Sequence, residues 1–139
     1  MGETEANLAL VRRAYDAWNR NDWEALEEIY DPAVTAVAPE GFMESSRVRG
    51  WPDLQQRYRE LKAAWEEESL EIEEIAAEDE MVAARVRWDG IGRASGAPIS
   101  LQVTNLVEIA DGRITRLEYF WTYEDALAAM RERADAARA

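Results

Sequence analysis

Hydrophobic and polar residues repeat with two different periods along the chain, and the main change of period, after about residue 68, separates a mainly helical first part from a second part of strands that ends in one more helix. In the first part, apolar residues recur every three or four positions, which is typical of helices that bury one face. In the second part they recur at about every second position, as in strands with one buried face. The predicted helices cover residues 5–20, 23–30, 51–68 and 124–137. The predicted strands cover residues 33–38, 70–75, 81–91, 99–109 and 114–122.

Turn-forming and capping residues set the limits of several elements. Asp22 can cap the second helix, and Pro32 ends that helix because its ring disfavours helical geometry at Asp31. Pro52 suits the first turn of the third helix. Asp111-Gly112 predicts a tight hairpin between the last two strands. The segment 39–50 is predicted to be a loop.

Helices that are separate from an antiparallel meander indicate the α+β class. We expect a strongly curved, cone-shaped antiparallel sheet, with three helices packed on its concave face around a pocket. A length of 139 residues suits a single domain over residues 1–139.

Charge and composition narrow the range of partners and chemistries. The chain has 29 acidic and 16 basic residues, and its net charge of −13 would repel nucleic acid. The first seven residues are polar and acidic, and no apolar stretch reaches the roughly 18 residues of a membrane span, so we expect a cytoplasmic protein without a membrane partner. The chain has no Cys and no His. Thiol nucleophiles, imidazole bases and thiolate or imidazole metal sites are therefore excluded, and we expect no metal and no cofactor.

Short motifs spread along the chain point to one known family. They are residues 10–23 (LVRRAYDAWNRNDW), 39–41 (PEG), 49–51 (RGW), 92–96 (GRASG), 111–114 (DGRI) and 118–121 (EYFW). From about residue 7 to residue 130, their order and spacing resemble SnoaL-like proteins of the nuclear transport factor 2-like superfamily. The resemblance implies a cone-shaped α+β barrel that is often a homodimer packed through its sheet. It implies no single reaction, because the superfamily includes isomerases, cyclases, dehydratases, epoxide hydrolases and proteins without known catalysis.

The resemblance also implies where catalytic residues would lie, and several of those positions carry other residues here. Ketosteroid isomerase-like members use a carboxylate base, a tyrosine and a protonated acid. The base position falls near Ala38, the tyrosine at Ala14 beside Tyr15, and the acid near Asn105. The usual isomerase base is therefore absent.

The aspartates that two other reactions of the superfamily need are also absent from this chain. In the epoxide hydrolase pattern the arginine position matches Arg85, while Arg87 and Trp121 stand where the two aspartates would be. Trp121 also occupies or adjoins the base position of the polyketide cyclases, and an indole cannot accept a proton there.

Five residues remain as catalytic candidates. Tyr15, Asn105 and Tyr119 could orient a carbonyl group by hydrogen bonds, with Glu118 or Glu40 as the base. Strand alternation, however, places Glu118 on the face opposite Tyr119. This favours a carboxylate on the surface or at a dimer interface.

Arg85 and Arg87 share one face of their strand. They could present a cationic patch to an anionic or carbonyl-bearing ligand. Alternatively they pair with Glu side chains across the sheet or a dimer interface, which is favoured in so acidic a chain. Residues 66–74 are rich in Glu and are predicted to form a solvated surface.

Aromatic residues are the most informative feature, since six Trp in 139 residues is a high content. They could line a pocket for a flat hydrophobic molecule or simply fill the interior of the cone. The predicted ligand-binding residues are Trp18, Trp51, Tyr58, Trp65, Arg85 and Trp121.

Two hypotheses of function follow. In the first, the chain binds a small hydrophobic, carbonyl-bearing molecule, and any catalysis is non-hydrolytic isomerisation, cyclisation or dehydration without metal. In the second, it is a catalytically inert dimerisation or ligand-sensing domain whose interior is filled by its own aromatic residues. A cavity of about 300 Å³ or more would favour the first hypothesis.

Overall fold

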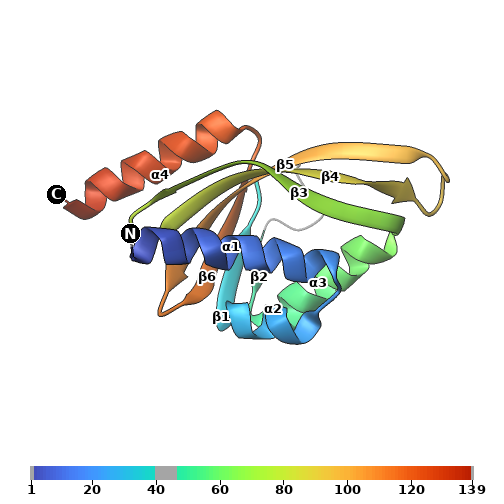
Figure 1. Ribbon diagram of the computed structural model, residues 1–139, viewed down its shortest axis with the longest axis horizontal. Helices are drawn as coiled ribbons and strands as arrows, with labels where there is room; N and C mark the ends of the chain where they lie inside the picture. The colour runs from blue at the N-terminus through green and yellow to red at the C-terminus, as the bar shows by residue number, and fades with distance from the viewer. Residues whose placement is uncertain (1, 40–46, 139) are drawn as a thin grey trace.

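A computed structural model describes residues 2–39 and 47–138 and has the predicted α+β architecture (Figure 1). The order of elements is α1 (Glu3–Asn19), α2 (Trp23–Ile29), β1 (Tyr30–Val37), β2 (Arg47–Arg49), α3 (Trp51–Ala63), β3 (Trp65–Glu78), β4 (Met81–Gly92), β5 (Pro98–Ala110), β6 (Arg113–Phe120) and α4 (Tyr123–Arg138). The strands form one curved sheet in the order β2-β1-β6-β5-β4-β3. All neighbouring strands are antiparallel except β1 and β6, which are parallel.

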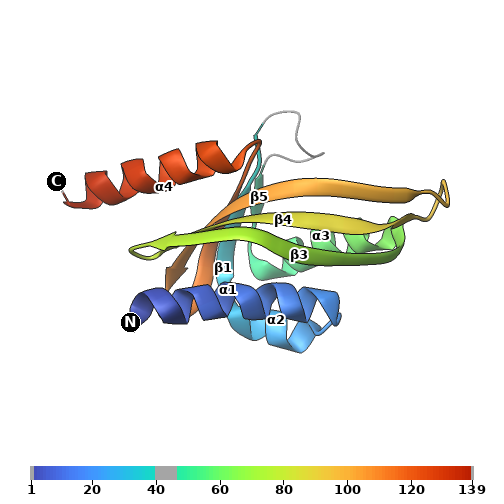
Figure 2. The ribbon, with the colours of Figure 1, turned by 45° about the horizontal axis from the view of Figure 1, so that its top comes forward.

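The described part of the chain has four helices, and they cover both faces of the sheet. α1, α2 and α3 lie against one face, while α4 lies against the other (Figure 2). Apolar residues of α4 at helical spacing, among them Tyr123, Ala126 and Met130, pack on Met81 and Leu106 in a separate core cluster. The prediction of three helices on one face therefore leaves out the layer that α4 forms on the opposite face.

Local signals in the sequence set several element boundaries correctly. The Asp22 carboxylate accepts a hydrogen bond from the backbone N–H of Ala25 at 3.1 Å and caps α2. Asp111 and Gly112 both have positive φ angles, 52° and 75°, as the tight hairpin between β5 and β6 requires. No helix of the described residues is long and apolar enough to cross a membrane.

The third helix is shorter than predicted, because its expected last turn is instead the start of a strand. α3 ends at Ala63, and Trp65 begins β3 opposite Gly92. The Trp65 ring stacks on Trp88 at 4.6 Å and fills the space over Gly90, where a Cβ atom would come within 2.5 Å of it. This non-local packing overrides the helical spacing that placed Trp65 on the face of α3.

Two further segments also differ from the sequence prediction. β3 extends over Trp65–Glu78, well beyond the predicted 70–75, because it pairs with β4 along its whole length. β2 lies within the segment predicted to be a loop and pairs with β1, with Arg49 opposite Thr35. The candidate base Glu40 lies outside the described residues.

Candidate functional site

A cavity of about 60 Å³ lies between the inner face of the sheet and helices α1, α2 and α3. Aliphatic and aromatic side chains form most of its wall. The described residues that line it are Val11, Ala14, Tyr15, Trp18, Leu26, Tyr30, Tyr58, Leu61, Leu70, Val86, Trp88, Val103, Asn105, Val107, Ile114, Leu117 and Tyr119. Five predicted site residues, Tyr15, Trp18, Tyr58, Asn105 and Tyr119, are thus brought together around one cavity.

Tyr15 and Asn105 form a polar pair in this apolar wall. α1 supplies Tyr15 and β5 supplies Asn105, and the Asn105 side-chain N–H donates a short hydrogen bond to the Tyr15 hydroxyl. Asn105 is buried, and its Oδ1 has no hydrogen-bond partner in the described part of the chain. An unpaired buried carbonyl oxygen costs roughly 1–3 kcal/mol of folding free energy. The pair therefore leaves hydrogen-bonding capacity unused at the cavity.

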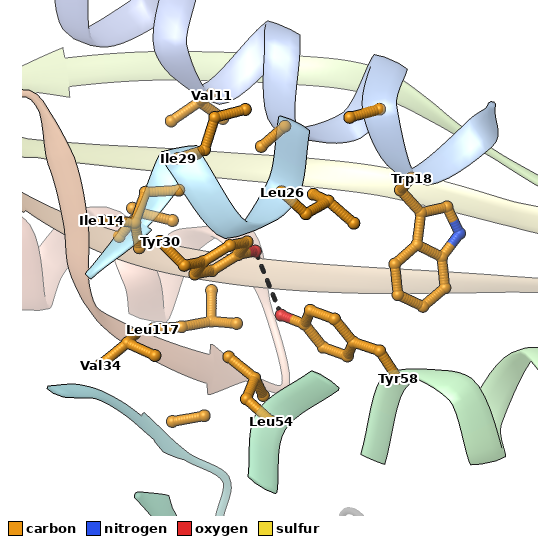
Figure 3. Close-up of a cluster of buried hydrophobic side chains, with 14 of the residues drawn as sticks. Val11, Trp18, Leu26, Ile29, Tyr30, Val34, Leu54, Tyr58, Ile114 and Leu117 are labelled. Carbon is orange, nitrogen blue, oxygen red and sulfur yellow. Dashed lines mark hydrogen bonds between the residues drawn. The ribbon is translucent and has the colours of Figure 1, made fainter. Parts of the chain in front are cut away.

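Three more tyrosines line the cavity, and all four are neutral at ordinary pH. The hydroxyls of Tyr30 and Tyr58 point toward each other and lie 3.2 Å apart, with Trp18 beside them (Figure 3). Burial raises the pKa of Tyr30 to about 12. Burial likewise raises the pKa values of Tyr15, Tyr58 and Tyr119 well above the usual range. These groups can donate and accept hydrogen bonds, but they do not supply an anionic base near neutral pH.

Stacked and edge-on aromatic rings hold the walls in place. Trp18 meets Tyr58 edge-on, with ring centroids 5.0 Å apart. Trp51 is buried behind the cavity, where it stacks on Tyr30 at 5.0 Å. Trp51 and Trp65 therefore support wall residues, and neither is among the residues that line the cavity.

Glu68 is a buried carboxylate that the sequence did not reveal. Its Oε1 accepts hydrogen bonds from the indole N–H groups of Trp18 at 2.7 Å and Trp88 at 2.9 Å. Its Oε2 lies 2.6 Å from the Lys62 ammonium, and the two charged side chains are only 9% and 10% exposed. The predicted solvated surface is wrong at this position, although Glu66 and Glu67 are exposed.

The environment of Glu68 fits a structural ion pair better than a catalytic base. Three donors occupy its two oxygens, since the two indoles share Oε1 and the Lys62 ammonium lies against Oε2. Desolvation lowers the pKa of Lys62, and the hydrogen bond and charge of Glu68 partly offset this effect. The Lys62 ammonium also lies 4.1 Å from the centre of the Trp18 ring, so the pair fixes a side chain of the cavity wall.

Glu118 lies on the opposite face of the sheet from the cavity, as strand alternation predicts. It pairs with Arg133 of α4 at 2.9 Å and with Arg116 at 3.4 Å. Its carboxylate therefore joins α4 to the sheet and is not among the groups that line the cavity.

Arg85 also faces away from the cavity. It pairs with Glu74 at 3.0 Å and with Glu73 at 3.4 Å, both on β3. Arg87 pairs with Asp89 at 2.6 Å and with Glu73 at 3.3 Å. This confirms the interpretation that these arginines pair with Glu side chains across the sheet.

Trp121 follows the end of β6, and its predicted position in the pocket is wrong. It is 60% exposed, because β6 ends at Phe120 and the chain then turns into α4.

Among residues 2–39 and 47–138, no group of three carboxylates is placed to hold a metal ion.

Comparison with known proteins identifies the fold and the family. One similar solved structure is a Jannaschia sp. CCS1 protein assigned as a SnoaL-like polyketide cyclase, with 17% identity, 94% of each chain covered and a TM-score of 0.77. A second is a Sinorhizobium meliloti protein assigned as a polyketide cyclase, with 27% identity, 81% of this chain and 94% of that chain covered and a TM-score of 0.65. A third is TerC crystallised with polyporic acid, with 18% identity, 91% of this chain and 98% of that chain covered and a TM-score of 0.73. No curated protein matches the sequence.

The match to a family agrees with the motifs in the sequence and with the architecture. Residues 11–117 match the SnoaL-like domain, a segment that runs from the middle of α1 to β6. This segment includes most of the cavity wall, from Val11 to Leu117. The chain belongs to the SnoaL-like domain family, with the nuclear transport factor 2-like fold.

Proposed function

We propose that this chain binds a small, largely hydrophobic molecule that carries a carbonyl or hydroxyl group, in the cavity beside Asn105. The observation that carries the proposal is the buried, unpaired half of the Asn105 side-chain amide next to the Tyr15 hydroxyl. In the observed orientation the pair offers the Asn105 Oδ1 as an acceptor and the Tyr15 hydroxyl proton as a donor. With the amide turned, Tyr15 would donate to Oδ1, and the Asn105 N–H groups would face a ligand carbonyl.

Binding is favoured over proton transfer by the groups that line the cavity. Among the lining residues that the structure describes, none is Asp or Glu. The tyrosines are neutral near pH 7, and the carboxylate of Glu68 is already occupied by Lys62 and two indoles. Isomerisation, cyclisation or dehydration would each need a base. The chain would therefore bind the kind of molecule that related enzymes convert.

The small size of the cavity favours a second candidate function, a catalytically inert dimerisation or ligand-sensing domain. A volume of about 60 Å³ is far below the roughly 300 Å³ of common ligand pockets, and stacked aromatic rings fill much of the interior. Under our first proposal, a ligand larger than a few atoms must displace side chains such as Leu61, which is only partly buried.

A pair of matched probes separates the two candidates. Acetophenone and ethylbenzene have similar shapes, but only acetophenone carries a carbonyl group. Binding is followed by the fluorescence of the six Trp and by backbone amide NMR shifts. Under the first proposal, acetophenone binds more tightly than ethylbenzene and moves the resonances of Asn105 and its neighbours.

Two variants localise the effect. Asn105→Leu should abolish the preference for acetophenone, whereas Thr104→Val should retain it. Thr104 is a matched control because it is an equally buried polar neighbour on the other face of the same strand. If neither probe binds to the wild-type protein, and native mass spectrometry of the protein as purified shows an unliganded dimer, the inert domain is the better description.

A further inference from the structure

Three arginines gather in a surface hollow beside the cavity, although the chain has a net charge of −13. The hollow has a volume of about 310 Å³ and lies between β2 and α3. The residues that line it are Arg47, Val48, Arg49, Asp53, Gln56, Arg57 and Glu60. We call it the arginine hollow.

Two arginines of the hollow differ from the arginines on the opposite face of the sheet. Arg85, Arg87 and Arg133 each pair with two or more carboxylates. Arg49 and Arg57 form no ion pair with any residue that the structure describes, even though Asp53 and Glu60 line the same hollow. Their guanidinium groups are therefore available to an anion. A carboxylate fits best, because a planar guanidinium can donate two parallel hydrogen bonds to its two oxygens.

A small void of about 20 Å³ shares wall residues both with the arginine hollow and with the cavity. Arg57 and Val48 line both the hollow and this void. Tyr119 and Leu61 line both the void and the cavity. Arg57 is also close enough to Tyr119 that its charge offsets part of the rise in the pKa of Tyr119, which burial and Tyr30 cause. The three spaces thus follow one another from Asn105 to Arg57.

We infer that the ligand is a hydrophobic carboxylic acid whose carboxylate binds Arg57 and Arg49, while its apolar body enters the cavity past Tyr119. The inference rests on the proposed function, since the cavity would hold the rest of the molecule. It adds the chemical class of the ligand and the end of the cavity at which the charged group lies. Leu61 and Tyr119 line both the void and the cavity, so a ligand that reaches from one space into the other must displace at least one of these two side chains.

The test compares two probes of similar shape, the anionic 4-acetylbenzoate and the neutral 4-acetylbenzamide, by titration at low and at physiological salt. The wild-type protein should bind the carboxylate about tenfold more tightly than the amide, with a smaller ratio at higher salt. Arg57→Gln should lower the affinity for the carboxylate to about that for the amide, whereas Arg57→Lys should retain part of the preference. Arg59→Gln is the matched control: Arg59 lies on the same helix, but it contacts Gln55 and the Trp23 ring and should leave both affinities unchanged.

The outcomes separate this inference from the proposed function. If both probes bind with equal affinity and Asn105→Leu weakens both, the cavity binds ligands but the arginine hollow does not select them, and the inference is overturned. If only the carboxylate binds, with dependence on Arg57 and none on Asn105, the hollow is a separate anion site, and its link to the cavity is overturned. Circular dichroism spectra of each variant show whether it folds. If Arg57→Gln does not fold, the carboxylate preference of Arg57→Lys is the test of the inference.

Discussion

The Tyr15–Asn105 pair allows a direct test of the idea that the cavity keeps a polar group at the expense of stability. The perturbation is a double-mutant cycle with Tyr15→Phe, Asn105→Leu and the double variant. The Tyr15 ring is partly exposed, but its hydroxyl is the buried end of the side chain. Asn105 is 5% exposed. Each substitution removes polar atoms and leaves an apolar side chain suited to the same wall.

The expected magnitudes follow from which polar groups each variant leaves unpaired. Tyr15→Phe leaves the whole Asn105 amide without a partner and should lower the free energy of unfolding by about 1–3 kcal/mol. Asn105→Leu leaves the Tyr15 hydroxyl unpaired but also removes the unpaired Oδ1, so its net cost should be within about 1 kcal/mol of zero. The double variant has no unpaired group at this position. It should be as stable as the wild-type protein or up to about 2 kcal/mol more stable.

Urea unfolding monitored by circular dichroism and Trp fluorescence measures these differences, provided that the slope with urea concentration is unchanged. The coupling energy between the two sites should be at least about 1 kcal/mol, as for residues in direct contact. A double variant that is less stable than either single variant would refute the reasoning. In that case the Asn105 amide contributes net stability, and nothing about it would call for a ligand.

Three other predictions concern stability. Glu68→Gln should lower the free energy of unfolding by about 3 kcal/mol, because the substitution leaves the buried Lys62 ammonium without its carboxylate. As a control in the same urea experiment, Glu66→Gln, at an exposed position, should change the free energy of unfolding by less than about 0.5 kcal/mol. Gly90→Ala should fold poorly or lose more than about 2 kcal/mol, because its Cβ would lie 2.1 Å from the carbonyl oxygen of Glu67, and a thermal melt shows this directly. Stability should also fall as the pH rises above 10, because burial raises the pKa values of Tyr15, Tyr30, Tyr58 and Tyr119 in the folded protein. Tyr30, whose pKa rises from 10.0 in the unfolded chain to about 12, should contribute about 3 kcal/mol of this fall between pH 10 and pH 12; its contribution is fully present below pH 10, and Tyr30→Phe should reduce the fall.

The sequence reveals those parts of the fold that depend on neighbouring residues. Asp22 caps α2 and Asp111-Gly112 turns between strands because each acts within four positions of its own backbone. The end of α3 depends instead on Trp65 packing over Gly90, which lies far along the chain on β4. Helical spacing cannot indicate such a contact, so the prediction carried the helix from Ala63 on to residue 68.

The candidate site shows the same division between local and distant information. Alternation along β6 correctly separated Glu118 from Tyr119, because that strand is regular where the two residues lie. β3 changes register between Trp65 and Glu67, and this irregularity places Glu68 on the inner face within a run of exposed carboxylates. The prediction places Trp121 in the pocket because it continues the last strand to residue 122, two residues beyond the end of β6 at Phe120. A single residue of error in a strand end or register is enough to exchange an inner position for an outer one.

The distribution of charge over the two faces of the sheet supports our proposal of binding rather than catalysis. On the outer face, Arg85, Arg87 and Glu118 each pair with oppositely charged neighbours, so their charges are used in holding strands and α4 together. On the inner face, the described groups that reach the cavity are neutral, and their raised pKa values keep them neutral well above pH 7. Such a surface can orient a carbonyl or hydroxyl group, but proton transfer needs a group that changes charge near the working pH. The described groups around the cavity are therefore consistent with our proposal of a site that binds a molecule without transforming it.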